Sequence, residues 1–153
     1  MADVSSLVSP LFLVSRVKDP EIPAMSIWDL GIVRSVETDG SRVTVTITPT
    51  YSGCPAMDTI RADITATLAD HGYECDIRTV YSPPWTTDMI SPLGRRHLAE
   101  VGIAPPGPAD RVVCPRCTAG DPRVVSEFGS TACKALMVCS SCGEPFDYFK
   151  VLN

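Results

Sequence analysis

The stretch that decides the fold of the first half of the chain is residues 42–72, RVTVTITPTYSGCPAMDTIRADITATLADHG. Valine or isoleucine alternates with threonine over residues 42–48, which predicts a strand with one buried face. Pro55 suits the first turn of a helix, and His71-Gly72 supplies a left-handed end to it. Between them, apolar side chains recur on one helical stripe. The stripe consists of Met57, Ile60, Ile64 and Leu68.

Upstream of this stretch, the sequence predicts a second strand and a short helix. Asp39-Gly40 is a strong turn signal between residues 32–36 and the strand at 42–48, so we expect an antiparallel hairpin. Pro10 begins an amphipathic helix that ends before Asp19-Pro20, since a residue followed by proline avoids the helical region. Its expected apolar stripe is Leu7, Leu11, Val14 and Val17.

Downstream, residues 73–81 predict a third strand, in which Cys75 shares a face with two apolar neighbours and is expected to be a buried small residue. A short helix begins at Ser91-Pro92 and stops at Gly102. The order helix, two strands, helix, strand, helix predicts a small α+β domain with its helices packed on one face of the sheet.

The domain boundary is expected in a proline-rich segment, since residues 103–110 read IAPPGPAD and cannot propagate a helix. We therefore expect an α+β domain at residues 1–103, a linker at 104–110 and a second module at 111–153.

Composition limits the classes of function. The chain has 153 residues, 44% of them hydrophobic, and a net charge of −5. This charge disfavours binding to nucleic acids or to anionic membranes. No apolar run reaches the ~18 residues of a membrane span, and the first residues lack the basic start of a secretory signal. A cytoplasmic protein is expected.

The second module carries two Cys-x-x-Cys pairs, Cys114 with Cys117 and Cys139 with Cys142. Two tight turns that face each other would build the four-sulfur tetrahedral site that zinc prefers. With strands expected at residues 123–128, 135–138 and 146–149, the module is interpreted as a ribbon with one structural zinc. Such a small module needs the metal to fold, which contributes on the order of 10 kcal/mol.

Other chemistry remains open for these thiols. The same four ligands could hold a rubredoxin-like iron or an iron–sulfur cluster, and a dithiol redox pair is a third alternative. Cys133 is a fifth thiol in the module, either a spare structural residue or an accessory thiol that exchanges metal.

In the first domain, Cys54 follows Gly53 at the expected start of a helix. Unpaired N–H groups and the helix dipole stabilise a thiolate there, so we expect a pKa below the ordinary value and a solvent-accessible thiol. The alternative is an apolar plug in a tight turn. No histidine is placed to activate this cysteine for hydrolysis.

Two further segments have both a structural and a functional interpretation. Asp19 and Glu21 lie on a rigid segment rich in proline, either as a helix terminator and solvated loop or as carboxylate ligands of a transient metal site. Trp85, after Ser82-Pro83-Pro84, either closes the core or is an exposed anchor for a partner.

Four motifs together resemble the iron–sulfur cluster assembly domain, of the SufT and MIP18 type. They are DPEIP at 19–23, SIWDLGIV at 26–33, TPTYSGCP at 48–55 and PWTTD at 84–88. With the cysteine pairs and the tail motifs EFGSTACKAL at 127–136 and CGEPFDYFK at 142–150, the chain resembles the PaaD family, the D subunits of the phenylacetyl-CoA 1,2-epoxidase system. The resemblance spans residues 9 to 152.

The resemblance implies a non-catalytic accessory subunit in aerobic phenylacetate catabolism, with the oxygenase and reductase subunits as partners and homodimerisation open. The chain lacks a nucleotide fingerprint and paired di-iron ligands, so the remaining role is to mature or repair metal centres. Cys54, Asp19 and Glu21 would then bind a transient iron or iron–sulfur cluster. A docking protein without metal transfer, or a thiol-dependent redox enzyme, is the alternative.

Overall fold

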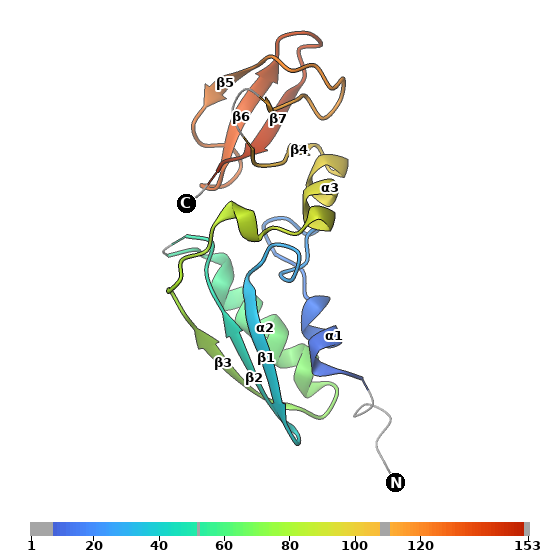
Figure 1. Ribbon diagram of the computed structural model, residues 1–153, viewed down its shortest axis with the longest axis vertical. Helices are drawn as coiled ribbons and strands as arrows, with labels where there is room; N and C mark the ends of the chain where they lie inside the picture. Colours follow the sequence, from blue (N-terminus) through green and yellow to red (C-terminus); the bar gives the residue numbers. More distant parts are fainter. Residues whose placement is uncertain (1–7, 52, 108–110, 152–153) are drawn as a thin grey trace. The chain divides into compact units, whose positions relative to one another are not determined.

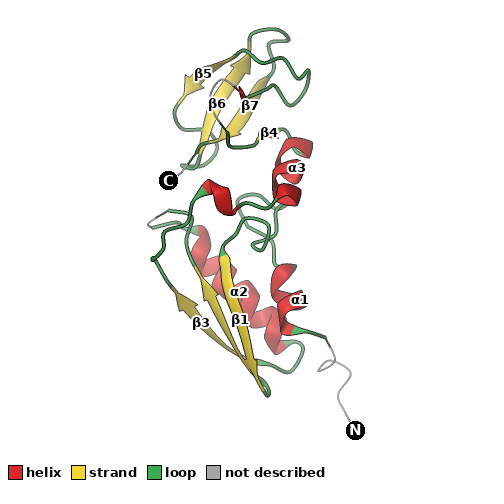
Figure 2. Ribbon diagram, viewed as in Figure 1, coloured by secondary structure: helices red, strands yellow, loops and turns green. Residues whose placement is uncertain are grey.

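The computed structural model describes residues 8–51, 53–107 and 111–151, and the chain divides into two compact units, Met1–Trp85 and Thr86–Asn153 (Figure 1). Leu7 and residues 108–110, which belong to the expected first helix and linker, lie outside the described residues. Helices and strands are mixed in the first unit, and the second is mainly a β-sheet (Figure 2). The α+β fold class expected from the sequence is confirmed.

The first unit contains two helices and a three-stranded sheet. Its elements in chain order are α1 (Pro10–Ser15), β1 (Val33–Asp39), β2 (Arg42–Ile47), α2 (Ala56–Ala69) and β3 (Glu74–Thr79). The sheet order is β1-β2-β3, with β1 and β2 antiparallel and β2 and β3 parallel. The two helices contact each other, and α2 also packs on β3. All five elements occur in the order that the sequence predicts.

The β1–β2 hairpin and α2 form for the reasons given by the sequence. Asp39 pairs with Arg42 across a turn in which Gly40 has a φ of +62°, a conformation that costs glycine little. The apolar residues of β2 and the predicted stripe of α2 are buried. They are Val43, Val45, Ile47, Met57, Ile60, Ile64 and Leu68. One alternating strand and one amphipathic helix thus supply most of this core.

Helix α1 differs from expectation in its phase. Leu11, which the expected stripe included, is 46% exposed, whereas Leu13 is buried beside Val14. The helix begins at Pro10, so residues three, four and seven positions later share a face, and that face carries Leu13, Val14 and Val17.

The second unit begins with two helical segments and continues into a four-stranded sheet. Its elements are η2 (Thr87–Met89), α3 (Pro92–Glu100), β4 (Ile103–Ala104), β5 (Pro122–Ser126), β6 (Lys134–Cys139) and β7 (Pro145–Phe149). The sheet order is β4-β7-β6-β5, and only the β4–β7 pair is parallel. Ser91 caps α3 by accepting a hydrogen bond from the Gly94 N–H at 2.9 Å, as expected for this helix start.

The segment expected to be the start of a linker forms part of this sheet. Ile103 and Ala104 are buried and pair with Asp147 and Tyr148 of β7. The division between the two compact units therefore falls after Trp85, and α3 and β4 belong to the second unit. Local composition does not reveal this pairing, because the partner strand lies more than forty residues further along the sequence. Whether residues 1–103 fold without residues 111–153 stays a prediction.

No helix among the described residues is long and apolar enough to cross a membrane.

Candidate metal centre and thiol site

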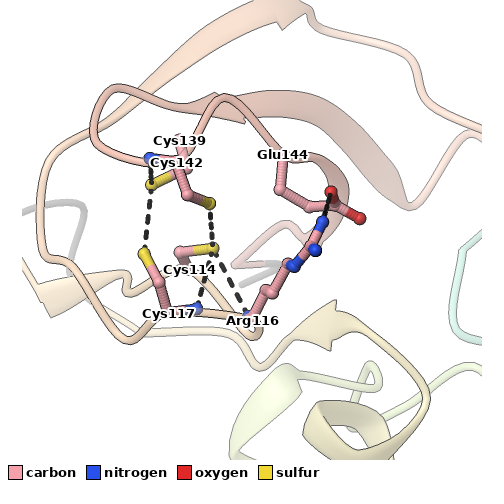
Figure 3. Close-up of polar contacts among 6 residues, drawn as sticks. All are labelled: Cys114, Arg116, Cys117, Cys139, Cys142 and Glu144. Atoms are coloured by element: carbon pink, nitrogen blue, oxygen red, sulfur yellow. Dashed lines mark hydrogen bonds and ion pairs between the residues drawn. The ribbon is translucent and has the colours of Figure 1, made fainter.

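The four cysteines of the second unit converge on one point. The Cys114 Sγ lies 3.8 Å from the Cys142 Sγ, and the Cys117 Sγ lies 3.5 Å from the Cys139 Sγ (Figure 3). All four sulfur atoms lie within 4.8 Å of one another. A tetrahedral site with metal–sulfur bonds of about 2.3 Å requires sulfur–sulfur separations of about 3.8 Å. The cluster therefore fits a four-coordinate metal ion.

Two turns of the same geometry hold these cysteines. In the first, Cys114 Sγ accepts hydrogen bonds from the N–H groups of Arg116 and Cys117 at 3.4 and 3.5 Å. In the second, Cys139 Sγ accepts them from Ser141 and Cys142, both at 3.4 Å. Backbone donors aimed at sulfur stabilise the thiolate form that a metal requires.

Each turn closes four residues after its first cysteine with a left-handed residue. Thr118 has a φ of +64° and donates its N–H to the Cys114 carbonyl, and Gly143 has a φ of +77° and donates to the Cys139 carbonyl. A threonine with positive φ is strained, and such strain concentrates at functional sites. The repetition indicates that both turns are shaped by the same ligand geometry.

The electrostatics of the cluster are those of thiols competing for protons. Hydrogen bonds from the Cys142 and Ser141 N–H groups lower the pKa of Cys139 to about 6. The Glu144 backbone lowers the pKa of Cys142, but burial and the neighbouring thiols outweigh it and raise that pKa to about 12. Four thiolates repel one another unless a cation lies between them, so a divalent metal stabilises the deprotonated form.

An ion pair links the two turns beside the cluster. Arg116 and Glu144 form a hydrogen-bonded ion pair of 2.8 Å, and the glutamate raises the pKa of the arginine (Figure 3). Cys114 and Cys139 are buried, whereas Cys117 and Cys142 are exposed. One half of the cluster therefore faces the core of the ribbon and the other faces solvent.

Cys133 does not belong to this cluster. It lies one residue before β6, whereas Cys139 is the last residue of that strand, so the two are separated by roughly 20 Å of extended chain. Its side chain is buried, and its Sγ lies 3.0 Å from the Thr131 Oγ1. Metal exchange with the four cysteines, the alternative considered for this thiol, requires a contact that this separation prevents.

Cys54 lies in the turn that leads into α2. Gly53 has a φ of +76°, the Cys54 N–H donates to the Tyr51 carbonyl, and the Cys54 carbonyl accepts from Met57. Pro55 is the N-cap rather than the first helical residue, so the helix begins one position later than expected. The thiol still lies beside the N-terminal N–H groups, and its hydrogen bond with the Ala56 backbone lowers its pKa.

The expected low pKa of Cys54 is wrong. Burial raises the pKa, and its effect exceeds that of the Ala56 N–H, because removing a thiolate from water costs more than one backbone donor returns. The carboxylate of Glu21 raises it further. The side chain is half-buried, so the thiol is protonated in the free protein at neutral pH.

The structure brings Glu21 close enough to Cys54 for its charge to act on the thiol, whereas Asp19 has a different role. Asp19 is buried, and its Oδ1 accepts hydrogen bonds from the N–H groups of Glu21 and Ile22 at 2.7 and 2.9 Å. Its own N–H donates to the Met25 carbonyl. Asp19 therefore shapes the loop that presents Glu21.

Two residues near Cys54 were not singled out from the sequence. The side chains of Thr50 and Tyr51 form hydrogen bonds with the thiol and lower its pKa. Both belong to the motif at residues 48–55, so their position was the available signal, although only the cysteine carries a chemistry that sequence alone reveals.

Trp85 is not an exposed anchor. It is 4% exposed, and its Nε1 donates a hydrogen bond of 2.8 Å to the Leu30 carbonyl, so it closes the core of the first unit. The exposed tryptophan of this unit is Trp28, at 45%. Cys75 shares the inner face of β3 as expected, but it is only partly buried, and that burial raises its pKa.

These features define a class of protein, an iron–sulfur-assembly-type α+β domain joined to a four-cysteine ribbon. Residues 13–73 match the family described as iron-sulfur cluster assembly protein, and residues 100–150 match the PaaD zinc beta ribbon domain. The chain belongs to the PaaD family, the D subunits of 1,2-phenylacetyl-CoA epoxidase. It is 44% identical over 148 residues to the putative PaaD-type epoxidase component of Escherichia coli K12, covering 92% of this chain and 90% of the relative.

The first unit also has relatives without the ribbon. The chain is 38% identical over 78 residues to the Fe-S protein maturation auxiliary factor SufT of Staphylococcus aureus, covering 49% of this chain and 88% of that factor. The crystal structure of a domain of unknown function, DUF59, from Bacillus anthracis superposes with a TM-score of 0.54 at 28% identity. That alignment covers 58% of this chain and 87% of the DUF59 domain.

Proposed function

We propose that this chain is a non-catalytic accessory subunit of the phenylacetyl-CoA 1,2-epoxidase system, and that it matures or repairs the iron or iron–sulfur centres of the oxygenase or the reductase. The observation that carries the proposal is the pairing of Cys54 with Glu21 at the start of α2, in a domain similar to Fe-S protein maturation factors. The oxygenase and reductase are partners by the same similarity to an epoxidase subunit.

The chemistry of the Cys54 site suits transient binding. A thiolate and a carboxylate together are acceptable ligands for iron, and an incoming cation favours loss of the thiol proton. Because burial and Glu21 raise the pKa of Cys54, the thiol stays protonated until cargo arrives. Two ligands from one chain bind iron weakly, which permits release to a client.

We propose a separate, resident role for the four-cysteine cluster, in which Cys114, Cys117, Cys139 and Cys142 hold one zinc ion. The sulfur–sulfur distances and the backbone donors to sulfur support this ligand set, and the match to a zinc ribbon domain supports zinc over iron. Zinc bound by four thiolates has no open coordination position and no redox chemistry, so it stabilises the fold.

One observation favours a second candidate function, a docking protein that stabilises the oxygenase without transferring metal. A half-buried thiol with a raised pKa is also what an apolar turn residue would show. A thiol-dependent redox enzyme receives less support, because redox thiols require a lowered pKa.

Anaerobic reconstitution with iron and sulfide distinguishes these functions. We expect the wild-type chain to carry one zinc and additional labile iron, and Cys54→Ser to lose the iron while it keeps the zinc. Cys75→Ser is the matched control, because Cys75 is also a partly buried thiol of the first unit with a raised pKa, and it should keep both metals. Zinc alone in the wild-type chain would support the docking function instead.

A further inference from the structure

The ribbon sheet ends in an edge strand that is apolar but uncovered within its own unit. Among the described strands, β5 pairs with β6 alone and forms one end of the order β4-β7-β6-β5 (Figure 2). Val124 and Val125 in β5 are 48% and 50% exposed. Edge strands present unpaired backbone N–H and C=O groups, and exposed valines beside them favour pairing with another strand.

The strand is not protected in the ways that edge strands usually are. Pro122 stands at its first position, where proline blocks no central hydrogen bond, and the β-bulge at Val125 leaves an apolar side chain exposed. Natural edges are commonly covered or carry inward-pointing charges. The exposed apolar surface of β5 indicates that another strand covers it in the assembled protein.

The sequence of this edge is complementary to itself. In an antiparallel pair of two copies centred on Val125, Arg123 of each copy stands opposite Glu127 of the other, and Pro122 opposite Phe128. Residues directly opposite each other on antiparallel strands interact, and opposite charges there are favourable. Neither Arg123 nor Glu127 forms an ion pair with any other described residue, so both charges are available for this contact.

We propose that β5 is a homodimerisation edge, and that two copies pair antiparallel through residues 122–128 to form one continuous sheet. Twofold symmetry makes the Arg123–Glu127 pair occur twice, which fixes the register, and the two Val125 side chains meet at the axis. Phe128, at 68% exposure, lies under the Lys150 Nζ at 4.7 Å and presents the rest of its ring to Pro122 of the second copy. This proposal does not depend on the function of Cys54.

A charge-exchange series on the full-length, metal-loaded chain tests the proposal by sedimentation. Such a short edge is a small interface, so we expect a monomer–dimer equilibrium with a dissociation constant of about 10–100 µM. Arg123→Glu and Glu127→Arg should each weaken dimerisation at least about tenfold, since both symmetric pairs become like-charged. The double variant should restore it.

The control exchanges the exposed pair on β3, Asp76→Arg with Arg78→Asp, which should leave dimerisation unchanged. Metal content and circular dichroism identify any variant that fails to fold. A wild-type chain that stays monomeric throughout this concentration range, or a dimer insensitive to either single charge reversal, would overturn the proposal. A monomer that binds a strand of the oxygenase or reductase at this edge would also overturn it.

Discussion

At the scale of single residues, Cys54 and Glu21 form a site in which protonation and metal binding compete. The helix N-terminus favours the thiolate, but burial and the neighbouring carboxylate favour the thiol. A divalent cation reverses this balance, because it attracts both groups. The raised pKa therefore belongs to the free site and predicts how the thiol reacts with an uncharged reagent.

Alkylation of Cys54 by iodoacetamide should be slow at pH 8 and should rise with pH beyond the ordinary thiol pKa, since only the thiolate reacts. Glu21→Gln removes one cause of the raised pKa and should accelerate alkylation at pH 8 by about two- to threefold. Glu37→Gln, at an exposed position in β1, should leave the rate unchanged. The measurement is the modification of the Cys54 peptide by mass spectrometry. A rate that levels off below pH 8 would contradict the predicted pKa.

Asp19 is expected to act through the stability of its loop. Asp19→Ala leaves the N–H groups of Glu21 and Ile22 without an acceptor and should lower the free energy of unfolding of the first unit by about 1–3 kcal/mol. Asp19→Asn keeps an oxygen acceptor and should cost less. Both tryptophans, Trp28 and Trp85, lie in this unit, so their fluorescence in urea reports its unfolding.

Asp76→Ala is the control, at a half-exposed carboxylate on β3, and should change stability by less than about 0.5 kcal/mol. If Asp19→Ala proved as stable as the wild-type chain, the loop-shaping role would be incorrect.

At the scale of elements, the two cysteine turns and the strand β6 determine the ribbon. Cys139 ends β6 and Cys133 precedes it, so two thiols at the ends of one strand have different surroundings. The metal joins the turn at Cys114 to the turn at Cys139, which otherwise share only the Arg116–Glu144 ion pair and the sheet. Because that ion pair is exposed, it contributes little to stability.

Cys114→Ser should abolish metal binding and unfold the ribbon, because structural zinc contributes on the order of 10 kcal/mol to such a module. Cys133→Ser should keep one metal per chain, since Cys133 lies at the far end of β6. Metal analysis and far-ultraviolet circular dichroism provide the readouts, and tryptophan fluorescence should show the first unit still folded. Full metal content in Cys114→Ser, or metal loss in Cys133→Ser, would refute the assignment.

At the scale of the whole molecule, local patterns predicted the elements, but the long-range pairings were not predictable. The alternation in β2 and the stripe of α2 follow from periodicity, and the cysteine spacing indicated the cluster. The pairing of β4 with β7 depends on two residues whose partner is distant in sequence, so composition alone suggested a linker there. The pKa of Cys54 depends on burial, which the helix start does not encode.

The proposed function joins the two units in one chain, with a weak thiol and carboxylate site in the first and a closed metal site in the second. Only the first is suited to transfer, because four thiolates hold a metal without an open position. Cys54→Ala removes the transfer ligand and leaves the buried stripe of α2 intact, so the variant should fold.

The most direct test is the iron content of the epoxidase oxygenase and reductase purified from cells that carry Cys54→Ala in place of the wild-type chain. Cells are grown under iron limitation and oxidative stress, with Cys75→Ala as the control. We expect oxygenase or reductase deficient in iron with Cys54→Ala and fully loaded partners with Cys75→Ala. Fully metallated and active partners in the Cys54→Ala strain would contradict the maturation function and favour docking alone.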